Sequence, residues 1–385
     1  MRDIPFGKPI IGDEERQAVG RVLAGTTLTH GPLVKEFEAV FARYTGAGYA
    51  VAVSSCTAAL HLAYFYLGVG PGDEVIVPAE THVATAHAVE LVGARPVFVD
   101  SEKVTGNIDI DRIEAAISPK TRAISVVHYL GMPVDMRRVV KIARKYKLFV
   151  VEDCALALGT YLGGVHAGLL GDVGCFSFYP VKHITTAEGG MVVTGIKDIA
   201  EKISRQRAFG IDRNIVSERP VPGVYDVVEL GLNYRLNEIG AALGIAQMKR
   251  LDGFLEKRRE NYAALTDGLQ GIDGIELLRS SHDEYRSSCY CQAAILEDSL
   301  AGKRFEIVRY LKERGVGTSV YYPHPVPHLE YYKRKYGYNA SSFPVAARIS
   351  GSSIALPVGP HVGREDIDYM VKTVKEAIEE VSRNE

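Results

Sequence analysis

The residues best suited to chemistry lie in one apolar segment that contains a single lysine. Residues 176–190 read FSFYPVKHITTAEGG, so Lys182 follows aromatic and aliphatic residues and precedes a turn rich in threonine and glycine. Burial of a lysine favours its neutral amine, which is the form that attacks a carbonyl carbon. This favours a Schiff base, most often with pyridoxal phosphate (PLP). Taken alone, the segment is equally consistent with a surface lysine that follows a strand.

Length, composition and charge limit the class of protein. The 385 residues are 46% hydrophobic, which is enough for a large core and for more than one domain. The formal net charge is -2, and charges of both signs are spread along the chain, which argues against nucleic-acid binding. The amino-terminal residues, MRDIP at 1–5, do not predict a signal peptide, and no apolar run is long enough to predict a membrane span.

The five cysteines predict a reducing environment. Their number is odd and most lie within apolar segments, at positions 56, 154, 175, 289 and 291. This pattern indicates buried, reduced thiols in a cytoplasmic protein. Cys289 and Cys291 form the only close pair, and no second pair or histidine cluster accompanies them. We therefore expect no metal site.

The first part of the chain alternates between strand-like and helix-like patterns. Strands are expected at 49–54, 74–78, 96–100, 123–128 and 148–152, and helices at 57–67, 81–92 and 136–146. Apolar strands that alternate with helices predict a mostly parallel sheet covered by helices on both faces. Ligands of such sheets bind at the carboxyl ends of the strands. Residues 55–57, Asp153 and Lys182 all lie just past expected strand ends.

The character of the chain changes after residue 235. Residues 237–270 are expected to form a long helix, followed by a strand at 290–296, a helix near 305–314 and a terminal helix from Arg364. The terminal helix has one apolar stripe, at residues 367, 370, 371, 374, 378 and 381. We predict a large domain over 1–250, which includes the amino-terminal segment, and a smaller α/β domain over 251–385.

A series of short motifs carries a family resemblance. In order they are THGP at 29–32, FE at 37–38, SSCTAALH at 54–61, DEVIVP at 73–78, THVAT at 81–85, VHYLG at 127–131, EDCA at 152–155, the lysine segment, GLNYRLNE at 231–238 and YP at 322–323. Over essentially its full length the chain resembles the sugar aminotransferases of the DegT/DnrJ/EryC1/StrS family, PLP enzymes of fold type I. The resemblance implies an α/β fold, with a mostly parallel seven-stranded sheet flanked by helices and a smaller C-terminal α/β domain.

The resemblance also implies which residues hold the cofactor phosphate. That phosphate carries about two negative charges and is suited to the unpaired amides at the start of a helix. The resemblance assigns it to the amides of Cys56 and Thr57, just before a helix expected at Ala58, and to the hydroxyl of Ser177. The alternative is that residues 55–57 are an ordinary helix N-cap.

Asp153 and Glu152 are alternative carboxylates for the cofactor ring. A carboxylate that faces the pyridine nitrogen keeps it protonated, so that the ring can accept electrons. Alternation along the expected strand points the two side chains to opposite sides, and the resemblance selects Asp153. An aspartate after a strand can also be a helix cap or a turn residue.

Two positions depart from the usual pattern of the family. His82 stands where relatives usually carry an aromatic ring stacked on the cofactor; an imidazole can stack more thinly, or it can be a structural histidine. Leu156 lies three residues past Asp153, where many relatives carry a glutamine or histidine that contacts the phenolic oxygen of the cofactor. Leucine cannot make that bond, so the contact is absent or comes from elsewhere.

The resemblance implies two tasks for Lys182 and a homodimer for the whole chain. Lys182 holds PLP as a Schiff base, and it moves the proton between substrate and cofactor carbons. Some family members carry histidine there and are dehydratases, but the register places Lys182, and not His183, in that position.

Asn233 resembles the residue that reaches the partner's PLP phosphate, which implies shared active sites. The alternative is that Asn233 caps the helix expected near Leu236.

The expected function is that of a PLP-dependent aminotransferase. It would move an amino group from L-glutamate to a 3- or 4-keto carbon of a nucleotide-linked deoxysugar, for amino-sugar or polysaccharide biosynthesis. The alternatives are a PLP-dependent sugar dehydratase of this family, an aminotransferase with another keto substrate, and a non-catalytic regulatory protein. The loops around 211–228 and 317–328 are expected to select the sugar.

Overall fold

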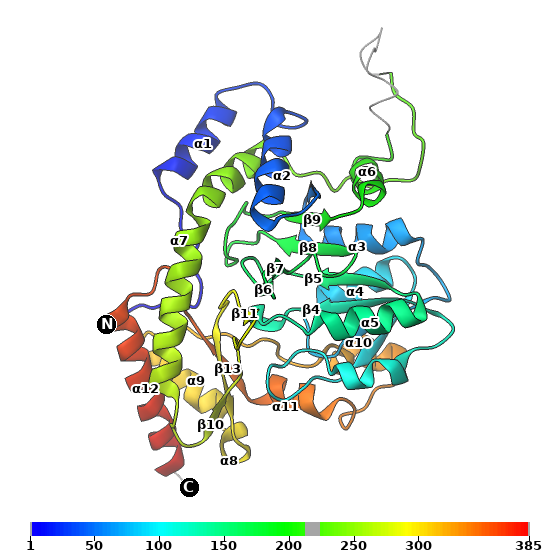
Figure 1. Cartoon of the computed structure of the whole chain (residues 1–385). Coiled ribbons are helices and arrows are strands. Elements are labelled where there is room, and N and C mark those ends of the chain that lie inside the picture. The colour runs from blue at the N-terminus through cyan, green and yellow to red at the C-terminus, as the bar shows by residue number, and fades with distance from the viewer. Residues whose placement is uncertain (1, 212–223, 384–385) are drawn as a thin grey trace.

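A seven-stranded sheet forms the centre of the molecule (Figure 1). The computed structural model describes residues 2–211 and 224–383. In spatial order the strands are β1 (Tyr49–Val53), β9 (Gly190–Thr194), β8 (Val173–Ser177), β5 (Phe149–Asp153), β4 (Thr121–Val127), β2 (Glu74–Pro78) and β3 (Arg95–Val99). Only β9 runs opposite to the other strands of this sheet. The predicted mostly parallel sheet is therefore confirmed.

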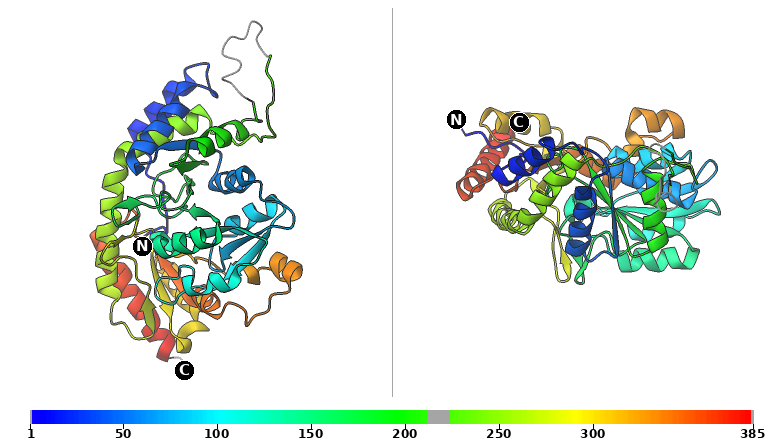
Figure 2. Two further views of the ribbon diagram at one scale, coloured as in Figure 1. Left: turned by 45° about the vertical axis from the view of Figure 1, so that its right-hand side comes forward. Right: turned by 90° about the horizontal axis from the view of Figure 1, so that it is seen from above.

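Helices cover both faces of this sheet, as Figure 2 shows from two further directions. Side chains alternate between the faces because the strand is pleated. Val75 and Val77 of β2 pack in one core, whereas Ile76 between them packs in another. The first core is covered by α3 (Cys56–Leu67), α4 (Val83–Leu91) and α6 (Lys197–Gln206). The other face is covered by α5 (Met136–Tyr146), α2 (Pro32–Thr45) and the first half of α7 (Glu238–Leu269).

A smaller antiparallel sheet lies in the carboxyl-terminal part of the chain. Its strands are β10 (Ile275–Leu277), β12 (Gln292–Leu296) and β13 (Ser353–Leu356). It shares a core with α9 (Arg304–Glu313), α12 (Arg364–Arg383) and the second half of α7. The apolar stripe predicted on the terminal helix is present, because α12 buries Ile367, Met370, Val374, Ile378 and Val381.

The predicted domain boundary at residue 250 falls inside α7, which is one continuous helix. Leu251 and Leu255 pack in the core of the large sheet, whereas Leu265 and Leu269 pack in the core of the small sheet. The amino-terminal Ile4 also belongs to the small-sheet core. The division into 1–250 and 251–385 stays a prediction.

Shorter elements complete the described chain. They are α1 (Asp13–Leu23), which lies against α7, and β6 (Tyr161–Leu162), β7 (Val165–His166), β11 (Tyr285–Arg286), α8 (Asp298–Ala301), α10 (Glu330–Tyr336), α11 (Pro344–Ser352), η1 (Ile110–Arg112), η2 (Glu114–Ala116), η3 (Tyr129–Gly131) and η4 (Val326–His328). None of the described helices is both long enough and apolar enough to cross a membrane.

Most predicted elements are present, with shifts of one or two residues at their ends. The strand predicted at 148–152 lies at 149–153, so Asp153 is the last residue of β5. The helix predicted from residue 81 begins at Val83, because His82 caps it. The strand predicted from residue 290 begins at Gln292. Periodicity locates the body of an element better than its cap.

Candidate active site

The predicted site residues meet at one edge of the large sheet. Asp153 ends β5, Ser177 ends β8, and Cys56 begins α3 after β1. Because β9 is antiparallel, Gly190 begins that strand at the same edge, where it pairs with Val53 and with Ser177. This is the carboxyl edge of the parallel strands, where ligands of such sheets bind.

The start of α3 and the backbone of Gly190 approach each other closely. A Cβ at Gly190 would lie 2.5 Å from the carbonyl carbon of Ser55 and 2.7 Å from the amide nitrogen of Cys56, so only glycine permits this approach. The Ser55 hydroxyl caps the helix by accepting a hydrogen bond from the amide of Ala58 at 3.1 Å. The first amides of a helix, here including Cys56 and Thr57, have no acceptor within it. This helix end is suited to a phosphate.

Lys182 lies in the connection between β8 and β9. A hydrogen bond from the amide of Phe178 to the carbonyl of Gly189, 2.9 Å long, closes this connection. The side chain of Lys182 is half-buried, and its Nζ lies 5.3 Å from the centroid of the Tyr290 ring. Desolvation lowers the pKa of Lys182 to about 8, although the charge of Asp153 acts in the opposite direction. Much of the amine is therefore neutral at mildly alkaline pH.

Tyr290 is a site residue that the sequence patterns did not find. Its ring lies beside Lys182 and 5.7 Å from the ring of His183, and its hydroxyl hydrogen-bonds that of Tyr321 at 2.8 Å. It precedes β12 of the small sheet, so no local motif connects it with the lysine. His183 is buried, and burial lowers its pKa well below the usual range.

Asp153 is buried at the site with hydroxyl and amide partners. Its Oδ2 accepts a hydrogen bond from the Thr85 hydroxyl at 2.8 Å, and its Oδ1 accepts one from the amide of Ala155 at 3.0 Å. No basic side chain among the described residues makes an ion pair with this carboxylate. A protonated pyridine nitrogen would supply that positive charge, so Asp153 fits the predicted role. Thr85, in the THVAT motif, was not among the predicted residues.

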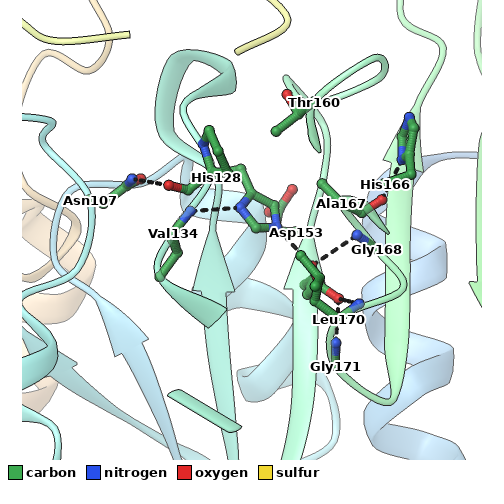
Figure 3. Close-up of polar contacts among 12 residues, drawn as sticks. Asn107, His128, Val134, Asp153, Thr160, His166, Ala167, Gly168, Leu170 and Gly171 are labelled. Atoms are coloured by element: carbon green, nitrogen blue, oxygen red, sulfur yellow. Dashed lines mark hydrogen bonds and ion pairs between the residues drawn. The ribbon is translucent and has the colours of Figure 1, made fainter. Parts of the chain in front are cut away.

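Glu152 has its hydrogen-bond partners on the other side of β5, in a closed network; Figure 3 labels four of them, His128, Gly168, Leu170 and Gly171. It is completely buried and accepts hydrogen bonds of 2.6–2.8 Å from the backbone amides of Gly168, Leu170 and Gly171. His128 lies 2.8 Å away through Nε2. Its Nδ1 accepts from the amide of Val134 at 3.1 Å, so Nε2 carries the hydrogen that it donates to Glu152. The predicted opposite orientation of the two carboxylates is confirmed.

This network contains a group of described residues with the spacing of metal ligands. One ligand atom each of His128, Glu152 and Cys154 lies within 4.8 Å of the others. The imidazole and the carboxylate are already paired with each other and with backbone amides, so these contacts account for the group without a metal.

His82 and Leu156 occupy different environments at the site. His82 caps α4 by accepting a hydrogen bond from the amide of Ala84 at 3.2 Å, and its ring meets that of Tyr322 edge-on at 5.6 Å. Desolvation lowers the pKa of His82, so the ring is neutral near pH 7. Leu156 is buried in an apolar cluster that includes Tyr290 and borders Tyr322.

Asn233 pairs with Ala208, which follows α6, and it does not cap α7. Its Oδ1 accepts a hydrogen bond from Nε of Arg235 at 3.0 Å, and the side chain is exposed. The N-cap of α7 is Asn237, whose Oδ1 accepts from the amide of Gly240 at 2.8 Å. The alternative that Asn233 caps this helix is therefore wrong.

Fold and sequence both place the chain among known aminotransferases. The model of the DegT/DnrJ/EryC1/StrS aminotransferase family matches residues 9–375, and the chain belongs to that family. It is 36% identical to the spore coat polysaccharide biosynthesis protein SpsC of Bacillus subtilis, over 97% of each chain. It is 34% identical to the GDP-perosamine synthase of Escherichia coli O157:H7, over 98% of this chain and 99% of that one. The PLP form of Spr1654 from Streptococcus pneumoniae superposes with a TM-score of 0.92, at 31% identity, over 99% of this chain and 100% of that one.

These comparisons confirm several predictions at the level of the family. The fold class, the membership of the family and the class of enzyme, a PLP-dependent aminotransferase, are as predicted. The alternative of a non-catalytic regulatory protein is set aside. Which residue of this chain binds each part of the cofactor stays a proposal.

Proposed function

We propose that the chain transfers an amino group from L-glutamate to a 3- or 4-keto carbon of a nucleotide-linked deoxysugar. The product would be an amino sugar for polysaccharide biosynthesis. One observation carries the proposal: a half-buried lysine with a pKa lowered to about 8 lies at the sheet edge that also holds Asp153 and the start of α3. The names of two relatives, a GDP-perosamine synthase and a spore coat polysaccharide biosynthesis protein, support the class of substrate.

The residues of this edge fit PLP part by part. When bound, PLP supplies a ring that accepts electrons from the substrate carbon. The amides of Cys56 and Thr57 and the hydroxyl of Ser177 would hold its phosphate. Asp153 would keep a proton on the ring nitrogen, since a buried carboxylate without a basic partner favours a cation beside it. His82 would lie against the ring.

Lys182 would have both a binding and a proton-transfer role. As a neutral amine it can bind the cofactor covalently, and once released it can take a proton from one carbon and return it to another. A pKa of about 8 suits both tasks, because each protonation state is then accessible near neutral pH.

We further propose a homodimer in which Asn233 reaches the phosphate site of the partner subunit. Exposed apolar side chains surround this segment, which is typical of an interface. They are Phe209, Val224, Tyr225, Val227, Val228 and Leu230, each more than two fifths exposed. The dimer would therefore cover apolar surface and complete two active sites together.

Two loops are proposed to select the sugar. Residues 212–223 of the first loop, 211–228, lie outside the described residues. The second, 317–328, carries Tyr321 and Tyr322, which contact Tyr290 and His82 respectively.

The five cysteines are all free and buried, which supports the proposal of a reducing, cytoplasmic location.

A substrate panel tests the proposed reaction. Purified protein with L-glutamate is offered nucleotide-linked 3-keto and 4-keto sugars, and formation of 2-oxoglutarate and of the aminated sugar is measured. We expect amine transfer to at least one keto sugar and none with Lys182→Ala. A sugar that loses water without gaining nitrogen would identify a dehydratase instead.

A further inference from the structure

We propose that Glu80 and Tyr129 form a clamp on the peptide group between Tyr321 and Tyr322, and that Glu80 is thereby a positioning residue for the active site. The location of that site rests on the proposed function. The clamp itself rests on contacts between residues far apart in the sequence, and neither Glu80 nor Tyr129 was among the predicted site residues.

The peptide group is held at both of its polar atoms. The hydroxyl of Tyr129 donates a hydrogen bond to the carbonyl oxygen of Tyr321, and Oε1 of Glu80 accepts one from the amide of Tyr322 at 2.9 Å. Tyr129 and Glu80 also approach each other, at 3.4 Å between Oη and Oε1. Both come from the large sheet, since Glu80 lies two residues past β2 and Tyr129 lies in η3 after β4.

The two tyrosines carried by this peptide lead to different parts of the candidate site. The hydroxyl of Tyr321 hydrogen-bonds that of Tyr290 at 2.8 Å, and the Tyr290 ring lies beside Nζ of Lys182. The ring of Tyr322 meets the ring of His82. One held peptide therefore fixes the aromatic neighbour of the lysine and the aromatic neighbour of His82.

Glu80 is an unusual residue to find in this position. It is 1% exposed, and no basic side chain among the described residues forms an ion pair with it. Its Oε2 is 2.6 Å from the Ser350 hydroxyl of α11. The titratable groups that face it are acidic: Asp100 after β3, Tyr129 from η3 and Tyr322 from the loop.

These surroundings favour a neutral acid. Burial raises the pKa of Glu80 to about 8, against the hydrogen bonds of Ser350, Tyr322 and Tyr129, which lower it; the charge of Asp100 acts in the same direction as burial. A neutral carboxylic acid can accept the amide hydrogen of Tyr322 on one oxygen and donate to Ser350 from the other. It joins the large sheet to two carboxyl-terminal segments without burying an unpaired charge.

Chemical labelling of Lys182 tests the clamp without measuring turnover. Cofactor-free full-length protein is treated with an amine-acylating reagent over a range of pH, and modification of Lys182 is followed by peptide mass spectrometry. Tyr129→Phe removes the bond to the Tyr321 carbonyl but keeps the ring. We expect a rate constant at pH 8 lower by about threefold to tenfold, because a lysine that Tyr290 encloses less well has a pKa closer to 10.5 and therefore less neutral amine to acylate.

Ser350→Ala is the matched control. It also removes one buried hydroxyl that contacts Glu80, but it leaves both bonds to the Tyr321–Tyr322 peptide. We expect its labelling rate to stay within about twofold of the wild type. Equal rates for Tyr129→Phe and the wild type, or equal reductions in both variants, would overturn the clamp.

Glu80→Gln and Glu80→Ala separate a neutral acid from an ionised one. Glutamine is neutral and can make the bonds to Tyr322 and Ser350, so we expect nearly wild-type Lys182 labelling and, in the PLP-loaded enzyme, nearly wild-type kcat and KM. Alanine frees the peptide, so labelling should slow as in Tyr129→Phe. If glutamine impairs labelling as much as alanine does, Glu80 acts as a carboxylate and the proposal is wrong.

The dependence of stability on pH gives a second measure. The folded chain holds the Glu80 proton up to about pH 8, whereas the unfolded chain loses it near the ordinary value of 4.5. The stabilisation is therefore fully present below 4.5 and is lost as the pH rises towards 8. Glu80→Gln should flatten the fall in melting temperature over this window, and an unchanged slope would contradict a buried neutral acid.

Failure of the clamp and failure of the proposed function are distinguishable. Borohydride treatment of the wild type with PLP, followed by peptide mapping, tests whether Lys182 binds the cofactor. A label on another lysine would overturn the proposed function, whereas the contrast between Tyr129→Phe and Ser350→Ala in cofactor-free protein would still decide the clamp.

Discussion

Glu152 and Asp153 are adjacent carboxylates at the end of one strand, and their surroundings differ completely. Glu152 accepts hydrogen bonds from three backbone amides and from the Nε2–H of His128, so protein donors surround its carboxylate. Asp153 has three nearby donors, the hydroxyl of Thr85, the amide of Ala155 and the thiol of Cys56 at 3.9 Å, and no basic partner among the described residues. The hydrogen-bond network of Glu152 is therefore complete, whereas the carboxylate of Asp153 has no positively charged partner among the described residues.

The difference separates a structural carboxylate from one available for chemistry. A buried carboxylate is costly unless it is fully hydrogen-bonded or paired. Glu152 meets this demand by fixing the turn at 168–171 against the sheet. Asp153 meets it only in part, and it lies on the same side as Cys56, Thr85 and the lysine connection. Substitutions on the two sides should therefore affect different measurable properties.

The side of β5 that holds Asp153, Cys56, Thr85 and the lysine connection is called the open side below. The largest effect is expected there, from Lys182→Ala. Transamination should fall by at least about a thousandfold, because both covalent attachment and proton transfer are lost. The melting temperature of the cofactor-free protein should change little, since removal of a half-buried amine leaves no unpaired group. Borohydride labelling of the wild type should map to Lys182, and residual turnover near the wild-type rate would reject the assignment.

The matched pair Asp153→Asn and Glu152→Gln tests the comparison directly. Asp153→Asn should lower kcat by about a hundredfold or more and leave the fold intact, because a neutral amide no longer keeps the ring nitrogen protonated. Glu152→Gln places an amide NH2 against backbone donors, so it should lower the free energy of unfolding by about 2–4 kcal/mol.

Denaturant unfolding measures the stability of Asp153→Asn and Glu152→Gln, and steady-state kinetics measures their kcat. The comparison fails if Asp153→Asn is the less stable variant and retains its rate, or if Glu152→Gln has the free energy of unfolding of the wild type.

Much of the fold was predictable because the strands are short apolar runs between helical patterns. The parallel sheet, α5 and the terminal stripe of α12 follow directly from periodicity. The long α7 was also predicted, but the proposed boundary fell inside it, because periodicity does not show where a helix passes from one core to another.

The site was predictable only where it is local. Lys182, Asp153 and residues 55–57 follow strands, and the topology of a parallel sheet brings strand ends together. Tyr290, Tyr321 and Glu80 come from three separate segments, and Tyr290 precedes a strand of the smaller sheet. Their convergence depends on how the two sheets pack against each other, for which no local pattern in the sequence provides a signal.

A mixing experiment tests whether the open side is completed by a partner subunit. Lys182→Ala and Asn233→Ala chains should each be inactive or strongly impaired, Asn233→Ala because the phosphate loses one donor. In an equal mixture, half of the dimers are hybrids, and each hybrid has one site without either lesion. Activity should therefore return to roughly a quarter of the wild-type value per chain.

The subunits must be allowed to exchange, and the dimers must be verified by size. Mixtures that stay inactive although each parent dimerises would falsify the shared site.

The smallest effect is expected at Leu156, where the open side borders an apolar cluster. Leu156 is 2% exposed and packs with Tyr290, whereas Leu158, two residues on, is 4% exposed and packs in the core beneath α2. Both leucines lie in the same segment after β5, so Leu158→Gln is a matched control. Each glutamine should cost about 1–3 kcal/mol of stability, because each buries an amide.

Only Leu156→Gln should also change the visible absorbance of the bound PLP or the pH dependence of that absorbance, and it should retain activity. The reason is position: a polar group three residues past Asp153 can reach the cofactor ring, whereas one at residue 158 is enclosed by apolar side chains on the other face. Spectra recorded across pH for both variants measure this difference. Identical spectra for Leu156→Gln and the wild type would show that this side chain faces away from the cofactor. Residue 156 would then not belong to the cofactor site.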